Sequence, residues 1–304
     1  MGRAAPLSNG VVVAGARGML GRAVVSLLRR YELPCLAMGR EQLDITRADS
    51  VRAGIPPGTG VVINCAAYTD VDGAEREPDK AQALNALGVA VLAERCREVG
   101  AVLVHYGTDY VFDGMGVDGG GGAGRAAAGA GPSPYTVGRA LSPLNAYGRS
   151  KAGGETALAG SGAEYLLLRT SWLYAPWGKN FVRTIARLAS ERPTLRVVDD
   201  QRGRPTSAEG LAETTLALLE AGARGVLHAT DGGDCTWFGF AQAIVHGLGL
   251  PARVEPGTTA EFPRPARRPA YSVLDLSETE ALVGPMRPWE ARLADVLGRL
   301  ERPL

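Results

Sequence analysis

The sequence has few cysteines and histidines, and neither residue type forms a recognisable pattern. The four cysteines are Cys35, Cys65, Cys96 and Cys235. They are scattered without a Cys-x-x-Cys pair, so we expect small buried thiols in a reducing compartment rather than disulfides. The three histidines are His105, His228 and His246. They lie far apart and outside metal-ligand spacing, which favours structural or surface positions and predicts no metal site.

Long apolar runs and an excess of one charge are also missing. No stretch approaches the ~18–20 apolar residues that a membrane span needs, and residues 1–10 lack the apolar segment of a signal peptide. The formal net charge is +1, which excludes a strongly basic nucleic-acid footprint. With 45% hydrophobic residues, the chain can bury a substantial core. The sequence thus predicts a folded cytoplasmic protein that binds neither nucleic acid nor membrane.

A glycine-rich turn between a strand and a helix is the first motif. The β-branched run at 11–14 predicts a buried strand, and the apolar spacing of residues 24–28 predicts a helix after the turn. Gly15 allows a tight turn, Gly18 lets the backbone approach a pyrophosphate, and Gly21 lets helix and strand pack closely. The spacing is G-x-x-G-x-x-G rather than the commoner G-x-G-x-x-G. The prediction of a dinucleotide site therefore depends on the strand before the turn and the helix after it. The predicted cofactor contacts in the turn also include Arg17, Met19 and Leu20.

An arginine follows the second predicted strand, at 35–38. An NAD-selective site would carry an acidic residue there for the ribose 2′-hydroxyl, whereas this chain has Arg40, with Arg17 inside the glycine turn. A guanidinium suits a 2′-phosphate, so the sequence favours NADPH. NADH stays open, because Glu41 is adjacent and Arg40 could be an ordinary exposed loop charge. Asp44 is assigned to the same cofactor site.

Two more strands are predicted at 61–67 and 102–105, with a helix at 81–99 between them. The first strand ends in small residues that would let a cofactor lie close. The cofactor contacts predicted there are Ala66, Ala67 and Tyr68. Thr108 follows the second strand, and ligands of open parallel sheets bind beyond the carboxyl ends of strands. Its hydroxyl is therefore well placed, although Ser and Thr are ordinary residues at strand ends.

Tyr147 and Lys151 stand four residues apart on a predicted helix, which puts both side chains on one face. A free phenol has a pKa near ~10. A neighbouring ammonium favours the phenolate and draws this pKa towards the working range. The pair is a candidate acid-base unit, but the same spacing also occurs by chance on many solvated helices.

Glycine and alanine dominate residues 114–131, of which nine of the eighteen are glycine. Such a segment cannot bury enough surface to offset its ordering entropy. We therefore expect a mobile surface insertion at 114–140, either a flap over the site or a dispensable linker.

Strands and helices alternate up to about residue 170 and less regularly afterwards. This pattern predicts an α/β protein with a Rossmann-type doubly wound parallel sheet and a smaller C-terminal substrate domain. The predicted cofactor domain is 8–170, with 207–230 returning to it. The predicted substrate domain consists of 171–206 and 231–304.

Four motifs occur in an order that resembles the extended short-chain dehydrogenase/reductases. They are Gly15-x-x-Gly18-x-x-Gly21, Asn64-Cys-Ala-Ala67, Gly107-Thr108-Asp109-Tyr110-Val-Phe and Tyr147-x-x-x-Lys151. Longer motifs resemble those of the dTDP-4-dehydrorhamnose reductases within that group, and the resemblance covers residues 11–297. The longer motifs are Ala67-Tyr-Thr-Asp-Val-Asp72, Thr108-Asp-Tyr-Val-Phe112, Arg169-Thr-Ser-Trp-Leu-Tyr174 and Asp200-Gln-Arg-Gly-Arg-Pro-Thr206.

The resemblance implies that NADPH reduces the C4 ketone of a dTDP-6-deoxy-4-keto-hexose, giving dTDP-L-rhamnose or dTDP-dihydrostreptose. It implies that Tyr147 donates the proton, that Lys151 holds the nicotinamide ribose and lowers the Tyr147 pKa, and that Thr108 hydrogen-bonds the carbonyl oxygen. Two hydroxyls aimed at that oxygen stabilise the charge that hydride transfer places on it. The substrate contacts that it implies are Thr69, Val71, Asp72, Thr108, Asp109, Trp172, Arg204 and Arg268.

The chain departs from this family's pattern at three positions. Gly107 replaces the usual serine before Thr-Asp, and Val137 replaces a common glutamate. Ala23 stands where some members carry a glutamate that helps bind Mg²⁺ at a dimer interface. No such metal is therefore predicted, and the protein is expected to be a monomer or homodimer.

Two other functions remain open on the same fold. One is a non-catalytic NADP-binding regulatory subunit, in which the catalytic residues are often degraded. The other is a nucleotide-sugar epimerase, which would keep NAD bound and favour an acidic residue at position 40.

Overall fold

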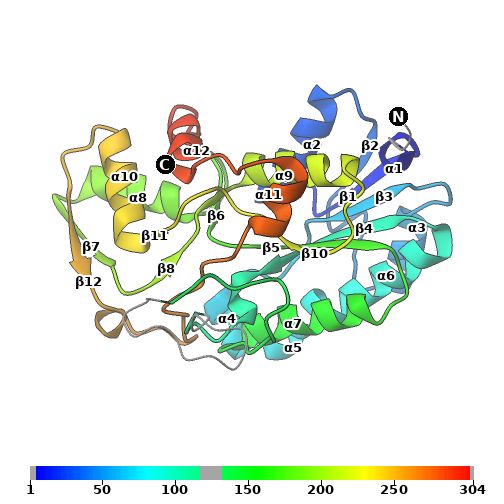
Figure 1. Ribbon diagram of the computed structural model, residues 1–304, viewed down its shortest axis with the longest axis horizontal. Helices are drawn as coiled ribbons and strands as arrows, with labels where there is room; N and C mark the ends of the chain where they lie inside the picture. The colour runs from blue at the N-terminus through cyan, green and yellow to red at the C-terminus, as the bar shows by residue number, and fades with distance from the viewer. Residues whose placement is uncertain (1–4, 117–131, 302–304) are drawn as a thin grey trace.

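A parallel sheet of six strands forms the centre of the computed structural model, which describes residues 5–116 and 132–301. The strand order is β10-β5-β4-β3-β1-β2 (Figure 1). In chain order the strands are β1 (Val11–Ala14), β2 (Cys35–Met38), β3 (Val61–Asn64), β4 (Val102–Thr108), β5 (Tyr165–Thr170) and β10 (Gly225–His228). The strand order reverses between β1 and β3, and the crevice beyond the carboxyl ends at such a point is where these sheets bind ligands.

Helices cover both faces of this sheet. On one face lie α2 (Met19–Arg30) and α9 (Ala208–Glu220), and on the other lie α3 (Ala48–Gly54), α6 (Gly88–Val99) and α7 (Ala146–Ala159) (Figure 1). Each layer of helices encloses its own apolar core against the sheet. The predicted α/β fold with a doubly wound parallel sheet is therefore confirmed.

The central strands are short and almost wholly apolar because both of their faces are covered. All four residues of β1 are buried, as are all four of β3. Such β-branched runs are typical of parallel strands inside an α/β layer. The strands predicted at 11–14 and 35–38 have these bounds in the structure.

The helix predicted at 81–99 is interrupted in the structure. It consists of α5 (Pro78–Gln82), a π-helical turn η1 (Ala83–Leu87) and α6. Asn85 lies in the π turn, where its amide donates to Ser150 Oγ at 2.9 Å and accepts from Tyr68 N at 2.8 Å. The wider turn accommodates a polar side chain that joins two segments, a feature that apolar spacing alone does not predict.

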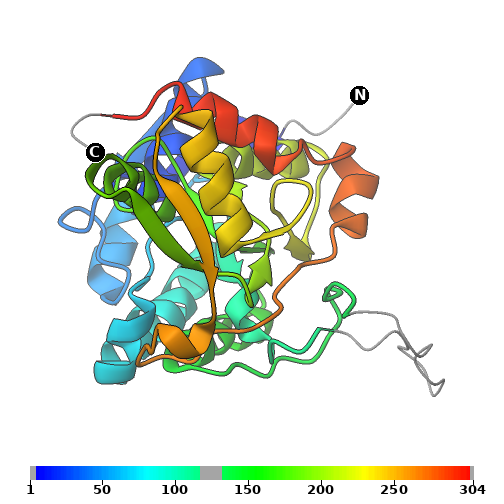
Figure 2. The ribbon, with the colours of Figure 1, turned by 90° about the vertical axis from the view of Figure 1, so that its left-hand side faces the viewer.

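A smaller part stands at one end of the sheet and has its own apolar core. Its helices are α8 (Phe181–Glu191), α10 (Trp237–Gly247) and α12 (Trp289–Leu297). Its strands are β6 (Leu173–Tyr174), β7 (Thr194–Val198), β8 (Arg202–Gly203), β9 (Thr206–Ser207), β11 (Cys235–Thr236) and β12 (Arg253–Gly257). Figure 2 views this end directly, with β7 beside β12. The predicted domain boundaries stay a prediction, although α9 and β10 do join the sheet.

Shorter helices complete the described chain: α1 (Ala5–Ser8), α4 (Val71–Arg76), α11 (Ser277–Val283), and the 3₁₀ turns η2 (Asp109–Val111) and η3 (Thr259–Glu261). Among the described helices, none is long and apolar enough to cross a membrane. Residues 117–131, which carry most of the predicted insertion, lie outside the described residues. Tyr135, in the later part of 114–140, is fully buried and stacks on Phe112 with ring centroids 4.3 Å apart.

Candidate active site

The predicted glycine turn connects β1 to α2 and contacts the end of β3. Gly15 has a φ of +69°, and a Cβ there would lie 2.7 Å from Ala66 N. A Cβ at Gly21 would overlap the backbone of Gly15 and Ala16. Only glycine fits at these two positions. The result is a cradle of backbone at a helix N-terminus, which suits a pyrophosphate.

Two exposed arginines stand beside this turn. Arg17 forms an ion pair with Glu41 at 2.9 Å, and Arg40 lies 3.8 Å from Asp44 with 80% of its side chain exposed. The Asp44 carboxylate also accepts from Thr46 N at 3.0 Å, so it shapes its own turn. Exposed ion pairs are weak. Both guanidiniums can therefore turn to an anionic ligand.

Met19 and Leu20 begin α2, and their side chains serve packing. The Met19 carbonyl accepts from Trp177 Nε1 at 3.1 Å, and the Leu20 side chain is buried in the core. The backbone N–H groups of this first turn are what the two residues can offer to a phosphate.

Hydrogen bonds hold the segment after β3 from two sides. Asn64 Oδ1 accepts from Ala66 N at 3.0 Å. Tyr68 N donates to Asn85, and the Tyr68 hydroxyl donates to Glu77 at 3.1 Å. These contacts fix the stretch that contains Ala66, Ala67 and Tyr68 next to the glycine turn.

The Tyr147 phenol lies at the start of α7, near the end of β4. Asn145 caps this helix by accepting from Gly148 N at 2.8 Å. Burial raises the pKa of Tyr147 to about 12, and the nearby Thr108 hydroxyl acts in the opposite direction. Burial, rather than the lowering expected from Lys151, therefore governs the pKa of this phenol. A neutral phenol is the form that can donate a proton.

Lys151 lies one turn further along α7 and is buried. Its Nζ donates to the Tyr106 carbonyl at 2.5 Å and lies 3.2 Å from His105 Nε2. Burial lowers the pKa of Lys151 to about 8, while the Glu155 carboxylate acts in the opposite direction. The Lys151 Nζ group is thus held against β4, behind Tyr147.

Asp109 follows Thr108 and is almost completely buried. The Thr108 hydroxyl donates to Asp109 Oδ1 at 3.1 Å. Burial raises the pKa of Asp109 to about 7, so this carboxyl is close to its titration point at neutral pH.

A buried ion pair joins α7 to β5. The Arg169 guanidinium donates to Glu155 with Nε at 3.0 Å and Nη2 at 2.8 Å. A Cβ at Gly107 would lie 2.9 Å from Glu155 Oε1 and 3.0 Å from Arg169 Cγ. Glycine at this position therefore leaves room for the ion pair.

Trp172 is held in an unusual conformation between the sheet and the smaller part. Its φ is +46°, which is rare for a residue other than glycine. Its ring stacks on Trp237 with centroids 3.5 Å apart, and a Cβ at Gly203 would lie 2.6 Å from it. Contacts on both sides fix the ring. A strained backbone conformation persists only where the surrounding structure holds it in this way.

The other predicted substrate residues fall into two groups. Asp72 pairs with Arg268 at 3.1 Å, and Arg268 in turn lies close enough to Tyr110 to influence its pKa. Val71 precedes Asp72 on α4, and Thr69 is exposed just before that helix. Arg204 instead donates to the Gly233 carbonyl at 3.2 Å. Its Nε is buried with no hydrogen-bond partner among the described residues.

Comparison with known proteins identifies the family. A model described as the RmlD substrate binding domain matches residues 9–302. The chain belongs to the RmlD family. Its relatives include a dTDP-4-dehydrorhamnose reductase from Mycobacterium tuberculosis, 44% identical with 95% of this chain and 93% of the relative covered. A dTDP-4-keto-6-deoxy-D-glucose reductase from Streptomyces niveus is 40% identical, with 93% and 94% covered.

A solved structure of an RmlD-family member is also similar over its whole length. It is a dTDP-4-dehydrorhamnose reductase from Bacillus anthracis in complex with NADP. The TM-score is 0.85 at 34% identity, and 94% of this chain and 98% of that chain are covered. The family resemblance inferred from the motifs is thus confirmed.

Several residues that lie beside the predicted catalytic residues were not predicted from the sequence. His105 was placed among structural or surface histidines, and Glu155 and Arg169 were not assigned to the site. The sequence did carry one signal for His105, because it is an ionisable residue inside a mostly apolar run, and all of β4 is buried in the structure. Which groups these side chains contact depends on pairing between distant segments.

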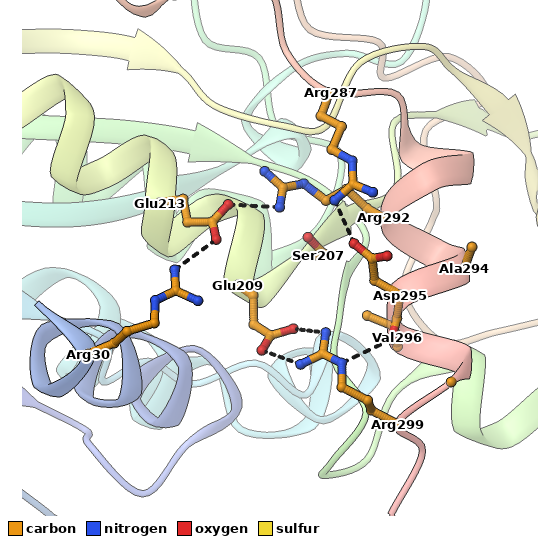
Figure 3. A pocket seen from close by; sticks show the side chains of 11 residues that line it. Arg30, Ser207, Glu209, Glu213, Arg287, Arg292, Ala294, Asp295, Val296 and Arg299 are labelled. Atoms are coloured by element: carbon orange, nitrogen blue, oxygen red, sulfur yellow. Dashed lines mark hydrogen bonds and ion pairs between the residues drawn. The ribbon is translucent and has the colours of Figure 1, made fainter.

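A cavity of about 420 Å³ lies elsewhere, between α2, α9 and α12 (Figure 3). It is lined by arginine and carboxylate side chains that already pair with one another. The pairs are Arg30–Glu213, Arg292–Glu213, Arg299–Glu209 and Arg287–Asp295. None of the predicted RmlD-family site residues lines this cavity.

Proposed function

We propose that this protein is an NADPH-dependent reductase of the C4 ketone of a dTDP-6-deoxy-4-keto-hexose. The observation that carries the proposal is the pair of Thr108 and Tyr147 hydroxyls near the carboxyl end of β4, close enough for Thr108 to influence the pKa of the phenol. Lys151 is buried behind that pair. The names of the RmlD-family relatives support the same reaction.

The residues of this chain would supply the acid half of the reaction. When bound, NADPH supplies the hydride, which places negative charge on the carbonyl oxygen. Tyr147 donates its proton to that oxygen, and Thr108 holds the oxygen by a hydrogen bond. Both interactions strengthen as the charge develops, so they lower the barrier rather than only binding the ketone.

The glycine cradle and the arginines beside it would bind the cofactor. The N–H groups of the first turn of α2, at Met19 and Leu20, would donate to the pyrophosphate, and Gly15, Gly18 and Ala66 would let it lie close to the backbone. Arg17 or Arg40 would bind a 2′-phosphate. An NADP complex of an RmlD-family structure supports this choice. NADH would be a weaker hydride donor, because it lacks the 2′-phosphate that would compete with Glu41 for Arg17.

The substrate would lie between the Tyr147 face and the smaller part. Trp172 offers a fixed apolar wall to the 6-deoxy sugar, with Val71 and Asp72 on the other side. We assign the diphosphate to Arg204 before Arg268, because Arg268 is already paired with Asp72 whereas Arg204 has an unpaired Nε. Thr69 and Asp109 complete the proposed substrate contacts.

The partners and location follow from this reaction. Besides the cofactor, the reaction needs a dTDP-sugar as its substrate, and we place the protein in the cytoplasm as a monomer or homodimer. Neither the regulatory subunit nor the epimerase is favoured, because Thr108, Tyr147 and Lys151 are all present and Arg40 is not acidic.

A panel of dTDP-4-keto sugars with NADPH and NADH tests the proposal. We expect NADPH oxidation with a 4-keto-6-deoxy sugar and slower turnover with NADH. Product configuration, read by NMR, identifies the sugar. Protein that leaves both cofactors unoxidised with every member of the panel would contradict the proposal.

A further inference from the structure

Three buried side chains form a hydrogen-bonded row behind the predicted catalytic pair. Asn64 Nδ2 lies 3.1 Å from His105 Nδ1, and His105 Nε2 lies 3.2 Å from Lys151 Nζ. All three are at most 2% exposed. They come from the end of β3, the middle of β4 and α7, so the row links two central strands to the helix that carries Tyr147.

The direction of the first hydrogen bond is fixed by the backbone. Ala66 N donates to Asn64 Oδ1 at 3.0 Å, so the carboxamide oxygen must face Ala66. The amide nitrogen then faces His105, and it can only donate. His105 Nδ1 must therefore be the acceptor, which leaves the proton of a neutral imidazole on Nε2.

This tautomer conflicts with a charged Lys151. An Nε2–H group points at Nζ, and an ammonium has three donors and no acceptor. A free amine has a lone pair that accepts this N–H, while its own N–H still donates to the Tyr106 carbonyl. Charging Lys151 requires the imidazole proton to move from Nε2 to Nδ1. Asn64 must then turn, which removes the acceptor of Ala66 N–H.

We propose that His105, with Asn64, is the positioning residue that couples the charge of Lys151 to its own tautomer. His105 carries Nε2–H while Lys151 is an amine and Nδ1–H once Lys151 is an ammonium. The coupling disfavours the ammonium, because it costs the hydrogen bond between Ala66 N–H and Asn64. The importance of Lys151 to the reaction rests on the proposed function, but the coupling itself does not.

Other groups around the row act on Lys151 as well. Glu155 on α7 favours the ammonium but is already paired with Arg169 of β5. On β4, the Tyr106 carbonyl accepts from Lys151 Nζ. Tyr147 precedes Lys151 by one turn and is neutral. Burial lowers the pKa of Lys151 to about 8 and holds that of His105 well below its usual value.

The composition of the chain makes the direct test practicable. The histidines are His105, His228 and His246, and the lysines are Lys80, Lys151 and Lys179. In His228 the ring has the opposite assignment, since Nδ1 donates to the Asp275 carbonyl at 2.9 Å and Nε2 accepts from Arg169. His228 is therefore an internal reference for the Nδ1–H tautomer.

The experiment is a pH titration of the wild-type protein by nitrogen-detected imidazole NMR and by the Lys Cε methylene signals. We expect His105 to show Nε2–H above the Lys151 midpoint and Nδ1–H below it, with both changes at one pH. His228 should keep Nδ1–H throughout. A His105 that remains in one tautomer while Lys151 titrates would overturn the proposal.

Two variants separate the coupling from simple burial. Asn64→Asp provides a carboxylate that accepts from both Ala66 N–H and Nδ1–H, so it should hold His105 as Nδ1–H at every pH. His105→Leu should raise the Lys151 midpoint by about one pH unit, a tenfold change in its acid constant. An unchanged midpoint in His105→Leu would contradict the proposal. If a variant fails to fold, the wild-type titration still decides.

Activity gives a separate readout. If the reductase needs the Lys151 ammonium, the alkaline limb of kcat/KM should move to higher pH in His105→Leu by the same shift. Coupled titration without any reductase activity would refute the proposed function and leave the His105 coupling intact. Reductase activity with an uncoupled His105 would do the reverse.

Discussion

At the scale of single residues, burial controls the chemistry of this site more than neighbouring charge does. The pKa of Tyr147 is raised to about 12 by burial, that of Asp109 to about 7, and that of Lys151 is lowered to about 8. Each shift disfavours the charged form. Burial therefore weakens the charged forms next to the position proposed for the ketone oxygen, where negative charge develops during the reaction.

Replacing Tyr147 by phenylalanine removes the proposed proton donor and keeps the ring. We expect kcat to fall by about 10²–10⁴-fold, the usual contribution of a positioned acid. Affinity for NADPH, measured by fluorescence titration, should change little because the ring still packs on Tyr110. Full turnover in Tyr147→Phe would remove this phenol from the mechanism.

His228 predicts a loss of stability in acid. Burial and the Arg169 guanidinium lower its pKa to about 4, whereas the unfolded chain titrates near 6.5. Between these values the unfolded state holds more protons, so stability falls as pH drops from about 6.5 to 4. The full contribution is about 3 kcal/mol.

Urea unfolding at pH 7.5 and pH 4.5 measures this effect. The wild type should lose more stability between the two pH values than His228→Gln does. His246 is exposed, so His246→Gln should match the wild type. An equal pH dependence in His228→Gln would show that the pKa of His228 is not lowered in the folded protein, and it would contradict the prediction.

At the scale of elements, α7 carries the site and is packed against the π turn without a gap. A Cβ at Gly154 would overlap the Asn85 carbonyl oxygen, a backbone atom that cannot easily move. Asn85 in turn binds Tyr68 and Ser150. The position of the catalytic helix therefore depends on a glycine one turn past Lys151.

Alanine at Gly154 should destabilise the protein by about 1–3 kcal/mol through overpacking. The matched control is Gly160→Ala at the end of the same helix, where the nearest atom to the new Cβ would be 3.6 Å away. Thermal unfolding followed by circular dichroism should show a lower Tm for Gly154→Ala alone. Equal melting of the two variants would contradict tight packing at η1.

The backbone elements that carry this site could be predicted from short stretches of sequence. The glycine turn, the strands at its edges and the Tyr147–Lys151 spacing depend on residues that are close in sequence. The partners of His105, Glu155 and Trp172 depend on contacts across long separations, such as β4 with α7 and β5. Their chemistry could be read from the sequence, but the groups that they face could not.

At the scale of the whole molecule, the two parts are interleaved rather than consecutive. The chain leaves the sheet after β5, builds β6 to β9 of the smaller part, and returns as α9 and β10. Helix α9 packs on α2, and β10 pairs with β5 along its length. The sheet therefore needs residues from both sides of the excursion.

A fragment that ends at residue 170 should not fold independently. It would lack β10 and α9, leaving one edge of β5 unpaired and the apolar face of α2 uncovered. Size-exclusion chromatography and circular dichroism should show an aggregated or unfolded fragment. A cooperative melt of this fragment would contradict the dependence of the sheet on the later segments.

The late position of β10 also has a consequence during synthesis on the ribosome. Five strands of the sheet emerge before the excursion begins, but the sixth is complete only once His228 has left the exit tunnel. Until then the nascent chain carries an open edge with backbone donors and acceptors available to other nascent chains. Rapid translation of residues 171–207, or a chaperone bound to that edge, would protect the nascent chain from pairing with another nascent chain.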